Sequence, residues 1–149
     1  MQLQPIKPTY TSAVEQMRAH RILRGQVQSI LAPYAINASQ WAILGSLYDR
    51  PEGMRPTDIA NLLEVKAPLI TLLVGPLFAR SLIDRGEQLP DKRARTITLT
   101  ASGRSMVEEA EDLLAALGPL LFKGISPSEM ATYHKILQAI IASEPASGI

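Results

Sequence analysis

The chain has 149 residues, of which 46% are hydrophobic and 19% are charged, proportions that are typical of an ordinary globular domain. It contains no cysteine, which excludes disulfide bonds, thiol catalysis and cysteine-ligated zinc sites. The N-terminus lacks the apolar run of a signal peptide, and no window reaches about 18 uncharged apolar residues. We therefore expect a single domain, residues 1–149, that is cytoplasmic and does not associate with a membrane.

The net charge of +1 conceals an uneven distribution along the chain. Residues 66–104 carry seven basic and three acidic residues, whereas residues 105–149 carry two basic and six acidic ones. A basic middle segment indicates a surface that binds a polyanion, although charges scattered over a solvated surface would give the same count.

The first predicted helix follows an extended arm that contains Pro5 and Pro8. Ser12 and Glu15 have the spacing of a capping box, so the helix is expected to begin at Ser12 and to end before Pro33. Its apolar residues lie on more than one side, which predicts packing against more than its own domain.

The next three predicted helices follow in close succession. Asn37 and Gln40 repeat the capping-box spacing and begin a helix that runs to about Asp49. A short helix begins at Pro56 or Thr57, and another spans roughly residues 67–80 after a turn of three or four residues. Two short helices joined so tightly are typical of a helix-turn-helix.

After residue 80 the pattern changes to that of a hairpin. Residues 81–85 and 95–100 are predicted strands, and the loop between them is long and basic. Thr100 or Ser102 then caps a helix that is expected to extend through Leu117.

The last helix is predicted by a third capping box, formed by Ser126 and Glu129, after a break at Gly118 and Pro119. The complete order predicts a mainly α fold with a small two-stranded β-wing, which is a winged helix-turn-helix flanked by N- and C-terminal helices.

Residues 36–108 contain an ordered set of short motifs. They are Gln40 with Trp41, Ile59 with Ala60, Thr71, Leu82-Ile83-Asp84-Arg85, Asp91-Lys92-Arg93, and Leu99-Thr100 with Gly103. In this ordered set the chain resembles the MarR family of transcriptional regulators.

The resemblance implies a homodimer whose dimerisation helices are residues 12–35 and 104–143. The winged helix-turn-helix region, residues 37–103, would then contact double-stranded DNA at a palindromic operator. Recognition helices about 34–36 Å apart reach successive major grooves, and a long first helix with a terminal helical pair is suited to this spacing. The implied function is that of a transcriptional repressor.

The wing supplies the predicted phosphate contacts. Lys92, Arg93 and Arg95 lie close together on the loop, where arginine can enter a minor groove. The resemblance implies that Asp91 orients Arg93, and Arg85 is a further candidate for phosphate contact. Arg104 is a candidate of the same kind, although both arginines could make only local salt bridges. Thr57 could also contact phosphate, but a capping role would explain it equally well.

The predicted recognition helix is unusually apolar. A buried stripe of Ile70, Leu73, Val74 and Leu77 would leave the DNA side with Lys66, Pro68, Leu69, Thr71, Leu72, Gly75 and Pro76. On that side only Lys66 and Thr71 can form hydrogen bonds, although Leu69 or Leu72 could contact thymine methyl groups. Pro76 is expected to kink or shorten the helix. Specificity would then come from the wing and DNA shape. Alternatively, the chain is a winged-helix protein-interaction module that has lost operator binding.

No catalytic arrangement is present in the sequence, so we expect no enzyme activity and no cofactor. His20 and His134 lack the spacing of a zinc pair, and a metal-sensing regulator would need a ligand cluster that the sequence does not offer. The resemblance implies release of DNA by a small aromatic or anionic effector. Its predicted pocket consists of Met17, His20, Arg24, Trp41, Leu44 and Tyr48, although core packing would explain Met17 and Trp41 equally well.

Overall fold

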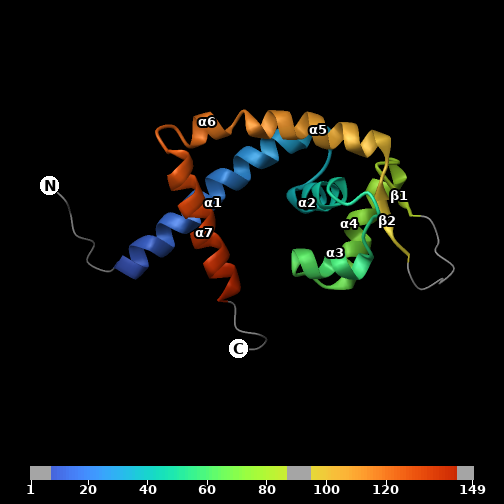
Figure 1. Ribbon diagram of the computed structural model, residues 1–149, viewed down its shortest axis with the longest axis horizontal. Coiled ribbons are helices and arrows are strands. Elements are labelled where there is room, and N and C mark those ends of the chain that lie inside the picture. Colours follow the sequence, from blue (N-terminus) through green and yellow to red (C-terminus); the bar gives the residue numbers. More distant parts are fainter. Residues whose placement is uncertain (1–7, 87–94, 144–149) are drawn as a thin grey trace. The chain divides into compact units, whose positions relative to one another are not determined.

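The computed structural model describes residues 8–86 and 95–143, with side chains from Ser12 onward. The chain forms two compact units, Met1–Leu114 and Ala115–Ile149. Figure 1 shows the described elements of the first unit, which are α1 (Pro8–Leu31), the 3-10 turn η1 (Ala32–Tyr34), α2 (Ala38–Tyr48), α3 (Pro56–Leu63), α4 (Ala67–Ala79), β1 (Ile83–Arg85), β2 (Ile97–Leu99) and nearly all of α5 (Ala101–Ala115). The second unit contains α6 (Gly118–Leu121) and α7 (Pro127–Ala142). The fold is mainly α with a two-stranded wing, as the sequence predicts.

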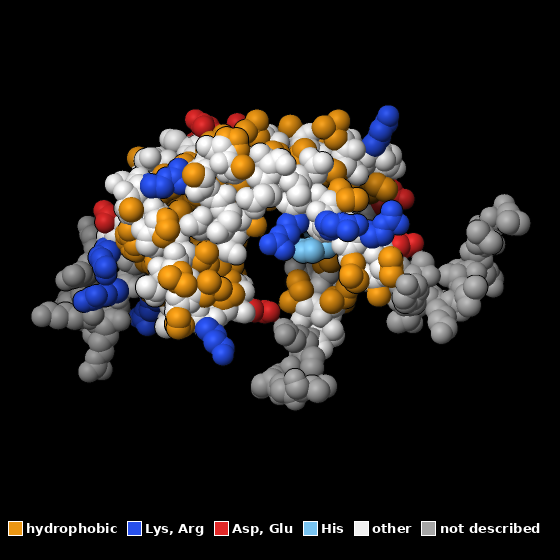
Figure 2. Space-filling model, turned by 180° about the vertical axis from the view of Figure 1, so that it is seen from behind, with side chains coloured by type: hydrophobic (Ala, Val, Ile, Leu, Met, Phe, Trp, Pro, Cys, Tyr) orange, Lys and Arg blue, Asp and Glu red, His pale blue; other side chains and the backbone are white. Residues whose placement is uncertain are grey.

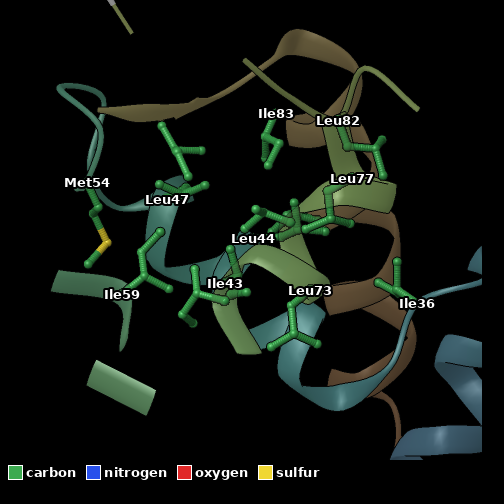
Figure 3. Packing of buried hydrophobic residues seen from close by; sticks show 14 of the residues in the cluster. Ile36, Ile43, Leu44, Leu47, Met54, Ile59, Leu73, Leu77, Leu82 and Ile83 are labelled. Carbon is green, nitrogen blue, oxygen red and sulfur yellow. The ribbon is translucent and has the colours of Figure 1, made fainter. Parts of the chain in front are cut away.

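The hydrophobic core of the first unit lies between α2 and α4. Leu44 from α2 and Leu73 and Leu77 from α4 lie close together in its middle (Figure 3). The four residues of α4 that are buried are the predicted stripe of Ile70, Leu73, Val74 and Leu77. The orientation of α4 predicted from its apolar spacing is therefore confirmed.

Two of the predicted capping boxes are present. At the start of α2, the Asn37 side chain accepts a hydrogen bond from the Gln40 backbone N–H (2.8 Å), and the Gln40 side chain accepts one from the Asn37 backbone N–H (3.0 Å). Ser126 and Glu129 make the equivalent pair at the start of α7. The hydrogen bond from the Ser126 backbone N–H, followed by that from its side chain, lowers the pKa of Glu129. Local side-chain chemistry thus determines where both helices begin.

One predicted helix start is wrong, whereas α3 begins at Pro56, one of its two predicted starts. The first helix begins at Pro8 rather than Ser12, because proline is tolerated in a first helical turn. Ser12 lies inside that helix, where its hydroxyl accepts a hydrogen bond from Gln16. The N-cap of α3 is Arg55, so Thr57 does not cap this helix.

The helix predicted to reach Leu117 ends at Ala115. Gly118 begins α6, a short helix with Pro119 in its first turn. The break predicted at these two residues is therefore present, and it lies slightly nearer to α5 than expected.

The strands β1 and β2 are antiparallel, and Asp84 lies opposite Thr98. Met54, in the segment before α3, extends this sheet through a backbone bridge to Ile97. The two hydrogen bonds of this bridge have nitrogen-to-oxygen distances of 2.9 and 2.7 Å. Gly53 has a φ of +84°, and a Cβ atom there would lie 2.6 Å from the carbonyl oxygen of Ile97. This pairing was not predicted from the sequence, because nothing local signals it.

The connection from β2 to α5 explains the motif of Thr100 and Gly103. The Thr100 hydroxyl accepts a hydrogen bond from the Gly103 N–H (3.0 Å) and donates one to the Ser81 carbonyl (2.6 Å). A Cβ atom on Gly103 would overlap the carbonyl oxygen of Leu82. The motif therefore joins the start of α5 to the base of the wing.

Candidate nucleic-acid interface

A helix-turn-helix is formed by α3 and α4. Glu64 ends α3 in the left-handed conformation (φ 53°), and the N–H of Val65 returns to the carbonyl of Ala60. The two helices are bent by 110° relative to each other, within the range of about 90–120° for this motif. The turn predicted from sequence therefore orients α4 as the second helix of the pair.

Gln40 connects the first turn of α2 to the middle of α4. Its side-chain oxygen takes part in the capping box, and its side-chain nitrogen donates a hydrogen bond to the backbone carbonyl of Leu73 (3.1 Å). It is the one buried polar residue among those that the structure describes. The sequence predicted the cap but not the bond to α4, because the partner carbonyl is remote in the chain.

The face of α4 opposite the core is open to solvent. Leu72 is 73% exposed and Leu69 is 41% exposed. Thr71 and Lys66 are exposed beside them. The helix continues through Pro76 to Ala79, so the predicted shortening at this proline is wrong. The stripe that packs on the core extends to Leu77, beyond the proline, and holds this last turn in place.

The base of the wing brings two arginines together. Arg85 and Arg95, with Gly86 and Thr96, line a hollow of about 240 Å³. The guanidinium of Arg85 also lies 5.6 Å from the centre of the Phe78 ring, at the end of α4. Figure 2 shows basic side chains around hydrophobic ones on the lobe beside the grey wing segment. The predicted wing residues Asp91, Lys92 and Arg93 lie outside the described residues.

Aromatic side chains connect α5 to the elements beneath it. The Tyr48 hydroxyl donates a hydrogen bond to Glu108 (2.9 Å), and the guanidinium of Arg104 lies 4.3 Å from the centre of the Tyr48 ring. The hydroxyl of Tyr34 contacts Glu109 at 3.5 Å. Burial, and then the Glu109 carboxylate, raise the pKa of Tyr34. Arg104 is thus engaged locally through an aromatic ring, which is not the salt bridge that its sequence position suggested.

A pocket of about 550 Å³ lies between α2 and α5. Trp41 and Tyr48 line it together with four carboxylate residues, and its complete lining is Trp41, Ala42, Gly45, Tyr48, Asp49, Val107, Glu108, Glu111 and Asp112. Leu44 is fully buried in the core and does not reach this pocket, because it lies on the side of α2 that faces α4. Its predicted place in an effector pocket is therefore wrong.

The remaining predicted pocket residues lie on α1. His20 and Arg24 line a separate shallow hollow with Arg21, Gly25 and Gln28. Met17 is 72% exposed on the same helix. The structure therefore does not bring the six predicted residues together. His20 and Arg24 line the hollow on α1, Met17 is exposed elsewhere on that helix, Trp41 and Tyr48 line the acidic pocket, and Leu44 lies in the core.

The described part of the chain offers neither a metal-ligating cluster nor a single helix suited to crossing a membrane. Within residues 8–86 and 95–143, no three His, Asp or Glu side chains are grouped so as to hold a metal ion. No single helix within these same ranges is both long and apolar enough to cross a membrane.

No family model matches the chain. Among solved structures it is similar to CouR from Rhodococcus jostii RHA1 bound to p-coumaroyl-CoA, with 22% identity, a TM-score of 0.82, and coverage of 97% of this chain and 100% of CouR. A MarR-family transcriptional regulator from Rhodococcus sp. RHA1 gives 22% identity and a TM-score of 0.79, and the alignment covers 91% of this chain and 96% of that one. The chain has the MarR-family fold.

A third MarR-like structure is MepR, a transcription regulator of the Staphylococcus aureus multidrug efflux pump MepA. It is 25% identical, with a TM-score of 0.67 and coverage of 90% of this chain and 98% of MepR. The likeness extends beyond the motif-bearing residues 36–108 to the flanking helices, which the sequence matched to the MarR family only by length and order.

Proposed function

We propose that this chain is a DNA-binding transcriptional regulator in which α4 enters the major groove and the wing contacts phosphates. The observation that carries the proposal is the exposed face of α4, which has Lys66 at one end and Arg85 beside Phe78 at the other. Basic residues at both ends of an exposed helix suit a groove with phosphate walls. The similarity to solved structures of transcriptional regulators supports the same function.

The proposal predicts strongly salt-dependent binding to duplex DNA. Affinity for random-sequence and genomic duplexes should fall as salt rises, with a slope of about −0.9 per phosphate contact in a log–log plot. Arg95→Ala should make the slope shallower by about 0.9 for each phosphate that this arginine neutralises. Arg93→Ala, in the predicted wing loop, should do the same. Fluorescence anisotropy across a salt titration measures both slopes.

Lys123→Ala provides a matched control, because Lys123 is exposed near the start of α7 and is remote from the wing in the chain. Its salt slope should equal that of the unmodified chain. If no duplex binds even at low salt, the DNA-binding function is refuted. The alternative, a winged helix that binds a protein through α4, would then be favoured.

A homodimer is the second part of the proposal, and the outer helices support it. No described residue of α7 is buried. Three of its apolar side chains are each more than half exposed, namely Ile136, Ile140 and Ile141. Met17 and Ile22 are similarly exposed on α1. Exposed apolar residues concentrated on helices mark interaction surfaces, and the family resemblance implies that a second copy covers them.

Sedimentation equilibrium tests the dimer. The unmodified chain should sediment at twice the 16.2 kDa mass of one chain. The double variant Ile136→Asp/Ile140→Asp should dissociate, because each buried isoleucine contributes about 2 kcal/mol of transfer free energy. Gln138→Asp, which adds one negative charge on the side of α7 opposite Ile136 and Ile140, should remain dimeric. A monomeric unmodified chain at micromolar concentration would contradict the proposal.

We further propose that a small aromatic effector binds the pocket between α2 and α5 and releases the DNA, so that the chain acts as a repressor. Trp41 and Tyr48 offer aromatic walls, and Asp49, Glu111 and Asp112 are exposed carboxylates beside them. These charges favour an effector with a cationic group over an anionic one at this place. The hollow at His20 and Arg24 has the opposite charge, but all of its residues come from α1 alone.

Trp41 is the only tryptophan of the chain, so its fluorescence reports directly on this pocket. Benzyltrimethylammonium should change the emission at lower concentration than benzoate does. Glu111→Gln should weaken the binding of benzyltrimethylammonium by about fivefold, as expected for the loss of a charge pair at 4 Å in water. Arg21→Gln, in the α1 hollow, should have no effect. Tighter binding of benzoate would contradict the cationic preference.

A further inference from the structure

The exposed face of α4 lacks the side chains that usually read base pairs. Between Ala67 and Ala79 there is no Arg, Asn, Gln, Asp or Glu, which are the residues that make bidentate or accepting contacts with base edges. Arg80 follows the helix, but one of its guanidinium nitrogens donates a hydrogen bond to the Ala35 carbonyl (3.2 Å). Thr71 and Lys66 are the hydrogen-bonding side chains that remain on this face.

Leu72 stands at the centre of the exposed face. Its neighbours on the helix surface, three and four positions away, are Pro68, Leu69, Gly75 and Pro76. A Cβ atom added to Gly75 would have nothing within 4 Å, so the backbone beside Leu72 is open to close approach. Leu72 is therefore the most exposed apolar side chain of this face, at 73% against 41% for its neighbour Leu69.

The major groove presents one apolar group among its base edges, the C5-methyl group of thymine. We infer that Leu72 reads thymine through this methyl group and is the specificity-determining residue of α4. The inference rests on the proposed DNA-binding function. The basic residues at the two ends of α4, Lys66 and Arg85, are complementary to phosphates on either side of a groove, which favours DNA over an apolar protein surface as the occupant.

The free energy of the contact between Leu72 and the methyl group limits how strongly α4 can prefer thymine. Burying one methyl group contributes about 0.8 kcal/mol, which corresponds to about a fourfold preference for thymine at the position that faces Leu72. A bidentate pair would discriminate more strongly, since it is worth about 1–3 kcal/mol. Sequence preference in α4 should therefore be modest and confined to thymine.

Deoxyuridine tests the inference, because it keeps the hydrogen-bonding groups of thymine and lacks the methyl group. The best-binding duplex is first selected from a random-sequence pool. Each thymine is then replaced singly by deoxyuridine, and affinities are measured at constant salt. Replacement at one position of the half-site should weaken binding by about fourfold, and this effect should disappear in Leu72→Ala.

Leu62→Ala is the matched control, because Leu62 is 50% exposed on α3 and lines a hollow with the acidic residues Glu52 and Asp58. It should keep the full difference between thymine and uracil. Circular dichroism of Leu72→Ala should match that of the unmodified chain, since this side chain lies outside the core.

The possible results distinguish a failure of the Leu72 contact from a failure of the proposed DNA-binding function. Salt-dependent duplex binding that is unaffected by uracil at every position would overturn the methyl contact and leave DNA binding intact. A thymine preference that persists in Leu72→Ala would also overturn the role of Leu72. Failure to bind any duplex at low salt would overturn both, and the face around Leu72 would then belong to a protein partner.

Discussion

The position of α4 depends on one buried side chain, Gln40. Its amide group uses its oxygen to complete the capping box with Asn37 and its nitrogen to bond the carbonyl of Leu73. Both polar ends of a buried amide are thereby satisfied, and leaving them unpaired would cost about 1–3 kcal/mol. The start of α2 and the middle of α4 are fixed together, so the direction in which α4 presents its outer face follows from the same residue.

The apolar core completes this arrangement. Because Leu73 and Leu77 pack against Leu44, the remaining faces of α4 are turned outward, with Leu72 at their centre. The wing is held by backbone pairing to Met54 and by the close contact of Gly103 with the loop that precedes β1. The scaffold thus presents an exposed apolar helix beside the arginines at the base of the wing. Under the proposed function, the helix would contact bases and the arginines would contact phosphates.

Local signals in the sequence predicted much of this structure. The capping boxes at Asn37 and Ser126 located α2 and α7, and the apolar spacing of α4 predicted its buried stripe. The bond from Gln40 to Leu73 and the pairing of Met54 join residues remote in the chain, which propensity cannot predict. The lining of the pocket between α2 and α5 was predicted only in part, because α2 is apolar on most sides and periodicity did not show that Leu44 faces the core.

The most direct test of this account is the unfolding free energy and duplex affinity of Gln40→Met, compared with Gln26→Met on the exposed surface of α1. Removal of both buried hydrogen bonds should lower the free energy of unfolding by about 1–3 kcal/mol. It should also reduce the preference for a selected duplex over a random one, while the salt dependence set by the wing remains. If Gln40→Met leaves stability and sequence preference unchanged, the buried hydrogen bond to the Leu73 carbonyl does not position α4.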